Sequence, residues 1–184
     1  MKAKAKDFYR LIINKTYNDK HSGPQRWDTT LNLDEEKWSD IFNSVRDISK
    51  ENKMKEFHFK FIHRIIVTKK ELHKFGIKTG DECIYCGEQD SIDHTFLECH
   101  FTQRFTRTCL SWFNDNNNTN FTPNKEELLF GIFNNSMPLL KKFNYTLLFI
   151  KRHIYTKKLN EEALLLSDFI KKIKFKYRIE KFQS

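Results

Sequence analysis

Residues 83–99 of the chain read CIYCGEQDSIDHTFLEC and hold four potential metal ligands within seventeen positions. These ligands are Cys83, Cys86, His94 and Cys99. Zinc prefers four sulfur or nitrogen donors in a tetrahedron, and a Cys-x2-Cys turn supplies two thiolates to one ion. Gly87 follows that turn and tolerates the backbone conformation that a tight turn needs. The spacing therefore predicts one zinc site of the Cys-Cys-His-Cys type.

An unbroken α-helix would not bring the last two ligands together. Ser91 or Asp93 is suited to cap a short helical turn that carries His94. Five residues at about 100° each leave His94 and Cys99 about 140° apart around the helix axis. We therefore expect the helix to kink or end between Leu97 and Cys99.

His100 is the rival for the fourth ligand position, but Cys99 preserves the more compact spacing. Ordinary buried cysteines beside a surface histidine are the alternative interpretation, and three of the four cysteines falling into this pattern argue against it. Four protein ligands leave no open position for water or substrate, so we expect a structural zinc ion rather than a catalytic one. We expect the fourth cysteine, Cys109, to be buried in a helix.

The composition is that of a folded chain. At 184 residues, with 39% hydrophobic and 15% aromatic side chains, it can form one domain, or two small ones, with a real core. The N-terminal residues lack the apolar segment of a secretion signal, and no apolar run approaches the length of a membrane span. Cysteines committed to a metal favour a reducing compartment. We therefore expect a soluble intracellular protein, nuclear or cytoplasmic, without membrane contact.

The net charge of +9 is unevenly distributed along the chain. Residues 1–78 carry 18 basic and 11 acidic side chains, residues 79–127 carry 3 and 9, and residues 128–184 carry 12 and 4. The zinc segment is thus acidic and is flanked by two basic arms. Basic faces attract phosphate backbones without regard to sequence, although runs of charge are also typical of solvated helix faces.

Hydrophobic periodicity predicts an all-α fold with little or no sheet. The zinc segment, residues 83–99, is expected to form a small zinc knuckle at its centre, hereafter the knuckle. The expected regions are a basic helical region (1–78), the zinc module and its following helix (79–113), an Asn-rich linker (114–122) and a C-terminal basic helical region (123–184). We expect helices over residues 3–18, 53–67, 138–158 and 161–181, with Ile65 on the buried face of the second. We also expect one helix to begin after an N-cap at Asp34 and a short one to begin at a capping box formed by Thr68 and Glu71. We expect breaks at residues 21–27, at Gly76 and in a flexible loop over 114–120, with Thr122 and Asn160 capping the helices that follow.

Three segments together match a known pattern: FIHRIIVTKKEL (61–72), Gly76-Ile-Lys, and the knuckle that ends in HTFLEC (94–99). They resemble the C-terminal segment of LINE-type non-LTR retrotransposon reverse transcriptases. The resemblance extends upstream to Trp27 and Trp38, and downstream through residues 127–132 to the final basic helices. It implies that zinc binds to the four ligands named above. It also implies a region that follows the polymerase core and helps to hold template RNA or target DNA during target-primed reverse transcription.

No catalytic motif accompanies this segment. The chain lacks a Tyr-x-Asp-Asp polymerase motif, a Pro-Asp nuclease motif, a phosphate-binding P-loop, and the GxSxG and HExxH motifs of hydrolases. The carboxylates at residues 34–36 are expected to stabilise a helix N-terminus. We therefore expect a non-catalytic domain of a transposable element that binds RNA or DNA. The polymerase core of the same element is a further candidate partner.

The candidate nucleic-acid contacts are Lys60, His63, Arg64, Lys69, Lys70, Lys74, Arg104 and Arg107. Basic side chains on both sides of the zinc knuckle would bind phosphates. His63 or Tyr85 would stack on unpaired bases, although Tyr85 fits a cover over the zinc sulfurs equally well. The alternative function is a zinc-stapled docking domain without direct nucleic-acid contact. The acidic zinc segment favours that alternative, and its surface would include Phe130 and Ile132.

Overall fold

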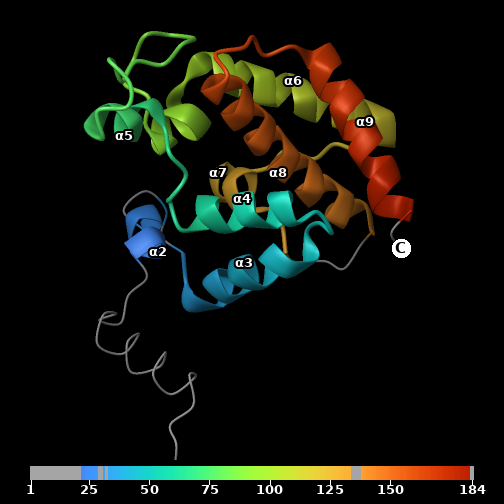
Figure 1. The fold of residues 1–184 in the computed structure, drawn as a ribbon. Coiled ribbons are helices and arrows are strands. Elements are labelled where there is room, and N and C mark those ends of the chain that lie inside the picture. Colours follow the sequence, from blue (N-terminus) through green and yellow to red (C-terminus); the bar gives the residue numbers. More distant parts are fainter. Residues whose placement is uncertain (1–21, 29–30, 32, 134–137, 183–184) are drawn as a thin grey trace, which may run out of the picture.

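The computed structural model describes residues 22–28, 31, 33–133 and 138–182, and these form an all-α fold (Figure 1). Its elements, in chain order, are α2 (Ser22–Asp28), α3 (Glu35–Asp47), α4 (Asn52–Ile62), α5 (Lys69–Lys74), the π-helix η1 (His94–Glu98), α6 (His100–Asn117), α7 (Lys125–Phe130), α8 (Pro138–Leu159) and α9 (Leu166–Phe182). Within the described ranges, the only β-type pairing is an isolated bridge between Glu82 and Gln89. The prediction of an all-α fold around a zinc knuckle is confirmed, whereas the helix expected over residues 3–18 lies outside the described residues.

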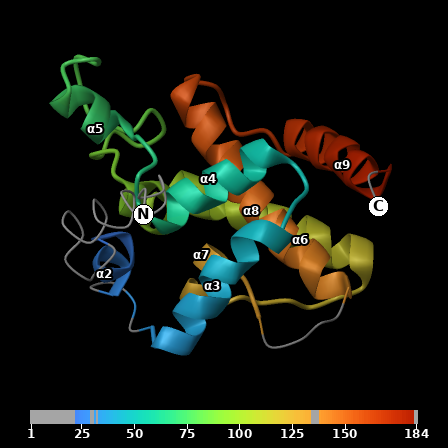
Figure 2. The same cartoon turned by 60° about the horizontal axis from the view of Figure 1, so that its bottom comes forward.

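Helix α8 lies at the centre of the packing. It contacts α4, α6, α7 and α9, while α3 packs against α4 and lines a surface hollow together with the start of α8 (Figures 1 and 2). Buried residues lie all round α8, as expected of a helix enclosed by others. They include three lysines and a histidine, and buried polar groups of this kind need partners inside the protein. Among the described helices, none combines the length and apolar character that crossing a bilayer needs.

Aromatic rings join α2, α3, α4 and α7 into one core. The ring centroid of Trp27 lies 5.4 Å from that of Phe61 and 5.4 Å from that of Phe130, and Trp38 lies 5.5 Å from Phe130. Tilted and edge-on contacts of this kind strengthen packing beyond simple area burial. Phe130 is only 2% exposed, so the prediction that it belongs to a docking surface is wrong. Ile132 is partly buried against a second, smaller core cluster.

The break predicted at residues 21–27 is also wrong, because helix α2 runs through residues 22–27 of this stretch. Pro24 lies in the first turn of α2, where a missing N–H removes no intrahelical hydrogen bond. Gly23 is needed for close packing rather than for a break. A Cβ at this position would lie 2.6 Å from the backbone Cα of His63.

The predicted helix signals that depend on local side chains are confirmed. Asp34 Oδ1 accepts a hydrogen bond from Lys37 N at 2.8 Å, as an N-cap does. Thr68 and Glu71 form the capping box that opens α5. Gly76 has a φ of +70° just beyond α5, which is the left-handed conformation that favours glycine. Cys109 is fully buried in α6, as expected.

Helix α4 ends at Ile62, five residues before the predicted end at residue 67. Arg64 has a φ of +52°, which a right-handed helix does not allow. Ile65, predicted to be buried, is 54% exposed as a result. Helix α9 likewise begins at Leu166 rather than at residue 161, because Glu161 has a φ of +56°.

The Asn-rich segment is better ordered than predicted. Helix α6 continues to Asn117, and Asn118 ends it with a φ of +50°. The side chain of Asn114 then donates to the carbonyl of Phe121 at 3.0 Å and accepts from its N–H at 3.1 Å. Asn124, rather than Thr122, caps the next helix, α7. Asparagine side chains form hydrogen bonds here that backbone groups would otherwise make. The loop expected over residues 114–120 therefore starts four residues later, after Asn117.

Candidate metal centre

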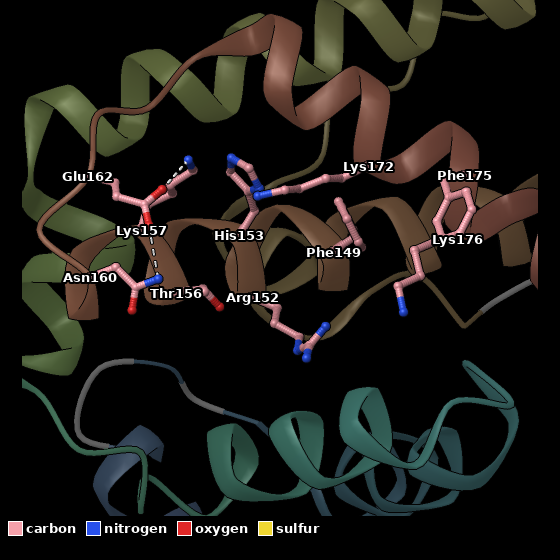
Figure 3. Close-up of a pocket in the computed structure, with 10 residues that line it drawn as sticks. All are labelled: Phe149, Arg152, His153, Thr156, Lys157, Asn160, Glu162, Lys172, Phe175 and Lys176. Carbon is pink, nitrogen blue, oxygen red and sulfur yellow. Dashed lines mark hydrogen bonds and ion pairs between the residues drawn. The ribbon is translucent and has the colours of Figure 1, made fainter.

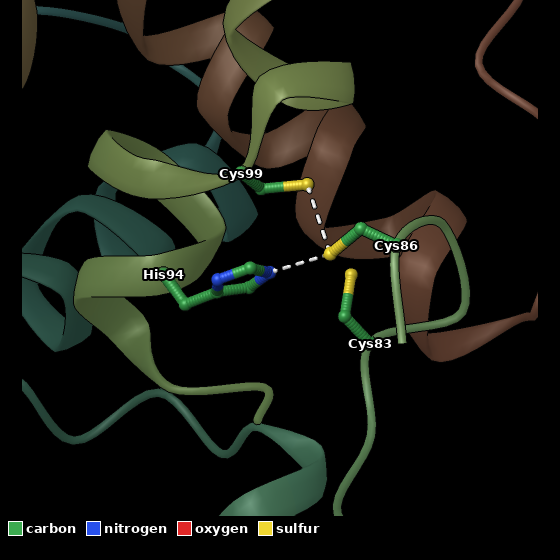
Figure 4. A group of neighbouring side chains, drawn as sticks. All are labelled: Cys83, Cys86, His94 and Cys99. Carbon is green, nitrogen blue, oxygen red and sulfur yellow. Dashed lines mark hydrogen bonds between the residues drawn. The ribbon is translucent and has the colours of Figure 1, made fainter. Parts of the chain in front are cut away.

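Four side chains converge where the chain passes from the knuckle into α6 (Figure 4). The ligand atoms of Cys83, Cys86, His94 and Cys99 all lie within 4.8 Å of one another. Cys86 Sγ is 3.8 Å from Cys99 Sγ and 3.1 Å from Nε2 of His94. With zinc–sulfur bonds of about 2.3 Å, a tetrahedron has sulfur–sulfur edges of about 3.8 Å. The residues therefore fit a tetrahedral zinc ion, as predicted.

The rival ligand is not part of this group. The side chain of His100 is exposed, and its ring centroid lies 4.2 Å from that of Phe101. Cys99, by contrast, is 1% exposed and close to Cys86. The fourth ligand is thus Cys99.

A single π-helical turn, η1, solves the geometric problem between the last two ligands. The N–H of Cys99 donates to the carbonyl of His94 at 2.8 Å, five residues back rather than four. This wider turn brings residues five apart onto the same side of the helix, and π-turns are characteristic of functional sites. The helical turn ends at Cys99, whose ψ of 115° is extended, as expected. Ser91, rather than Asp93, caps the turn by accepting from His94 N at 3.0 Å.

The surroundings of the ligands favour the metal-binding forms of Cys83 and His94 but not that of Cys86. Burial raises the pKa of the Cys83 thiol, but the N–H groups of Tyr85 and Cys86 and the charge of Lys158 bring it below its usual value. Burial, assisted by Lys158, lowers the pKa of His94 and so favours the neutral imidazole that a metal needs. Burial and the neighbouring sulfurs raise the pKa of Cys86 to about 11, so a metal ion must displace its proton.

A buried ion pair that no sequence pattern indicated fastens the knuckle to α8. Lys158 Nζ donates to Asp90 Oδ1 and, at 2.8 Å, to Thr95 Oγ1, which itself donates to Asp90 Oδ1 at 2.8 Å. Both charged side chains are only 6% exposed. Asp90 Oδ2 also accepts from the N–H of Lys69 at 3.2 Å, and the backbone carbonyl of Asp90 accepts from the N–H of Lys70 at 3.2 Å, which positions α5. One carboxylate thus holds α5, η1 and α8 together.

Arg64 fastens the other side of the knuckle. Its guanidinium binds the carboxylate of Asp93 through two hydrogen bonds, one of them 2.8 Å long. It also lies 4.2 Å from the centre of the Trp27 ring, as a cation–π pair does. The Arg64 side chain is 11% exposed. The structure therefore gives Arg64 an internal role in place of the predicted phosphate contact.

The remaining predicted contacts fall into two groups. Lys60 is exposed but bound to Glu56 at 2.6 Å, and Lys69 lies 3.5 Å from Glu161. His63 is partly buried, with the Phe59 ring 4.3 Å away. The other predicted contacts, Lys70, Lys74, Arg104 and Arg107, are exposed and have no carboxylate partner in the described part of the chain. The structure thus leaves this second group accessible.

Tyr85 does not present its polar end to solvent. Its hydroxyl donates to the carbonyl of Glu162 at 2.7 Å, in the connection between α8 and α9. Burial, with the nearby sulfurs, raises the pKa of this phenol above its usual value. Tyr85 therefore fastens the Cys-x2-Cys turn to the helical core instead of standing free for base stacking.

A compact helical domain held together by a Cys3His zinc site is the class that this fold and site define. Residues 8–105 match the family model described as zinc-binding in reverse transcriptase, and this stretch includes all four ligands. The match covers more than half of the chain, so the protein belongs to this family. The zinc ion is structural, because four protein ligands leave no open coordination position. No significant match to a curated protein was found.

Proposed function

We propose that the protein is a non-catalytic module that binds RNA or DNA for a reverse transcriptase. In this role the chain catalyses no reaction itself and helps to hold template RNA or target DNA during target-primed reverse transcription of a LINE-type element. Its partners are nucleic acid and the polymerase core of the same element. Zinc–thiolate ligation favours a reducing environment, so the proposal places this activity inside the cell, in the nucleus or the cytoplasm.

The supporting observation is the placement of unpaired cations next to the zinc centre. Helix α5 is fixed to the knuckle through Asp90 and carries Lys70 and Lys74. Helix α6 begins directly after the last zinc ligand and carries Arg104 and Arg107. All four side chains are exposed and have no carboxylate partner among the described residues. Zinc therefore fixes the directions of two helices that present positive charge, which is what binding to a phosphate backbone needs.

The acidic character of residues 79–127 does not oppose this proposal as strongly as the sequence suggests. Three of the nine carboxylates of this segment are bound by cations from outside it. These pairs are Asp90 with Lys158, Asp93 with Arg64, and Glu126 with Lys37. Repulsion of a phosphate backbone near the knuckle is reduced accordingly.

Salt-dependent binding tests the proposal directly. Zinc-loaded protein is titrated against labelled single-stranded RNA, single-stranded DNA and duplex DNA between low and moderate salt. We expect log affinity to fall linearly with log salt, and a Lys70→Gln/Lys74→Gln variant to reduce the slope by roughly 1.4 on a single strand. Cys86→Ser removes one zinc ligand and should abolish binding with the loss of zinc. Absence of binding to all three nucleic acids by protein that retains one zinc would overturn the proposal.

A docking role is the second candidate, supported by a different surface from the one predicted. Four large apolar side chains between residues 59 and 77 are exposed, namely Phe59 in α4 and Ile65, Phe75 and Ile77 after it. Exposed apolar residues gathered in one stretch are typical of protein interaction sites. If the zinc-loaded protein binds no nucleic acid, Phe75→Ser/Ile77→Ser should instead weaken its association with the polymerase core.

A further inference from the structure

A hollow of about 290 Å³ lies between α8 and α9, beyond the segment that matches the family model (Figure 3). Its lining includes Arg152 and His153 from α8, and Lys172, Phe175 and Lys176 from α9. The predicted nucleic-acid contacts lie elsewhere, between residues 60 and 107. Neither the zinc centre nor its supporting ion pairs therefore account for the chemistry of this hollow.

An exposed aromatic ring stands at one end of the hollow. Phe175 is 61% exposed, and Ile179, one turn further along α9, is 36% exposed. A phenylalanine this exposed leaves most of its apolar surface in water, which costs free energy unless a partner covers it. A flat aromatic ring beside cationic side chains is how single-strand-binding proteins hold an unpaired base.

Helix α9 supplies positive charge next to this ring. It carries six basic residues against two acidic ones. Lys171, Lys174 and Arg178 are exposed, and each lacks a carboxylate partner among the described side chains. Their spacing of three and four residues places them along one side of the helix, next to Phe175. These free cations can therefore track a phosphate backbone that passes over the ring.

Charges inside the hollow are partly compensated. Lys157 lies between two carboxylates, at 2.6 and 2.7 Å, and offers no free charge. Arg152 and Lys176 share a single carboxylate, Glu51, at 4.0 and 2.8 Å. Two cations on one anion leave a net positive charge. An incoming phosphate can therefore bind there without displacing a complete ion pair.

The wall of the hollow contains a polar atom that lacks a partner. The Nε2 atom of His153 is buried and has no hydrogen-bond partner among the described residues, with the Asp168 carboxylate 4.0 Å away. Burial, with the charge of Lys172, lowers the pKa of His153 to about 4, so the ring is neutral at pH 7. Figure 3 shows the Lys172 side chain reaching toward this ring. Lys172 is 51% exposed and also binds Asp168 at 3.1 Å, so a ligand that pairs with Nε2 takes the place of the Lys172 side chain and competes with this ion pair.

We propose that the hollow and the exposed face of α9 form a binding site for one unpaired nucleotide of single-stranded RNA or DNA. The base stacks on Phe175 with its polar edge toward His153. The phosphates on either side lie against Arg152, Lys176 and the free cations of α9. The site rests on the proposed nucleic-acid-binding function and gives it a specific location and a preference for single strands. An acidic peptide would use the cations but would gain little from the flat ring.

The test measures fluorescence anisotropy of labelled oligouridylate, oligothymidylate and a blunt DNA duplex with the zinc-loaded full chain. Phe175→Ala should weaken binding to both single strands by about tenfold and hardly change binding to the duplex. Ile179→Ala, which removes an exposed apolar side chain one turn away, is the matched control and should change affinity less than about twofold. Both positions are exposed, so neither substitution threatens the fold.

A second pair of variants tests the phosphate contacts. Lys171→Gln/Arg178→Gln should reduce the slope of log affinity against log salt by roughly 1.4 on single strands. Lys141→Gln, which removes an exposed cation at the start of α8 that has no carboxylate partner among the described residues, should leave that slope unchanged. If the unmodified protein binds single strands but Phe175→Ala and Lys171→Gln/Arg178→Gln bind equally well, the α9 site is wrong and the proposed function stands. Competition by polyglutamate as strong as by oligouridylate would also overturn the site, because charge alone would then explain binding.

Discussion

At the scale of single residues, the buried pair of Lys158 and Asp90 connects the zinc knuckle to the helical core. Taking two charges out of water is costly, and the pair is tolerated because both members make further hydrogen bonds inside the protein. Besides the lysine, the Asp90 carboxylate is bound by the Thr95 hydroxyl and by the backbone N–H of Lys69. Removing one member of such a pair leaves an uncompensated buried charge.

We therefore expect Asp90→Asn to lower the free energy of unfolding of the zinc-loaded protein by about 3–5 kcal/mol. Asparagine keeps a side-chain oxygen for the backbone N–H of Lys69 but leaves the charge of Lys158 unpaired. The double variant Asp90→Asn/Lys158→Met should recover most of the loss, since a double-mutant cycle separates the pair from its surroundings. Urea unfolding measures the free energy of unfolding of the single and the double variant. A loss below about 1 kcal/mol for Asp90→Asn would show that the pair is not as enclosed as the structure indicates.

Lys151 makes stability depend on pH. This lysine is buried in α8, donates to the carbonyl of Leu129, and lies 4.7 Å from the centre of the Phe61 ring. Burial lowers its pKa from 10.5 to about 7. Between these two values the unfolded chain binds more protons than the folded one, so stability rises with pH across this window.

Lys151→Met should flatten that rise by at most about 1.4 kcal/mol per pH unit between pH 7 and 10. The measurement is the urea midpoint of both proteins at several pH values. Zinc-bound thiolates titrate in both proteins, so the difference between them isolates the lysine. Parallel profiles for the two proteins would contradict the burial of a titrating amine.

At the scale of elements, the sequence predicted what neighbouring residues determine. The N-cap at Asp34, the capping box at Thr68 and the zinc spacing depend on side chains a few residues apart, and the structure bears them out. Contacts between distant segments were not visible in the sequence. Lys158 reaches Asp90 across 68 positions, and nothing local distinguishes it from a surface lysine except its place in an apolar helix.

The predicted ends of helices were wrong for a similar reason. Helix α4 stops where Arg64 takes a left-handed conformation and turns its side chain to Asp93 and Trp27. The hydrophobic pattern continues past that point to Ile65 and so predicted a longer helix. Periodicity reports which residues are apolar, whereas the end of this helix is set by an ion pair with a residue 29 positions away.

Arg64→Gln separates the structural role of this arginine from the predicted phosphate contact. It removes the partner of a partly buried carboxylate, and we expect a loss of about 1–3 kcal/mol in the free energy of unfolding. Lys70→Gln, at an exposed and unpaired position on α5, should stay within about 0.5 kcal/mol of the unmodified protein. Thermal unfolding of the two variants and of the unmodified protein compares their stabilities. Equal stabilities would mean that the contact between α4 and the knuckle carries little energy.

At the scale of the whole molecule, a core held by aromatic packing and a knuckle held by zinc both contact α8. Aromatic packing holds α2, α3, α4 and α7 together, and the zinc ion fixes the chain from residue 83 to residue 99. The knuckle itself buries few large side chains, as expected of a segment that depends on metal ligation for its order.

Removal of zinc by a chelator should therefore unfold the knuckle and its neighbours before the helical core. We expect backbone amides in η1 and α5 to lose protection from hydrogen exchange, because their hydrogen bonds depend on the ligated knuckle. Amides in the middle of α8 should stay protected, since aromatic and aliphatic side chains surround that helix. Simultaneous loss of protection in all helices would indicate a single cooperative unit instead.

The central claim is that one zinc ion, bound by three cysteines and one histidine, organises this domain. X-ray absorption at the zinc edge, together with zinc content per chain, tests it most directly on the purified protein. The account predicts one zinc with three sulfur neighbours at about 2.3 Å and one nitrogen at about 2.0–2.1 Å. It also predicts the same spectrum for His100→Gln and a loss of zinc for His94→Gln. An absence of zinc, or a shell of two sulfurs and two nitrogens that changes in His100→Gln, would contradict it.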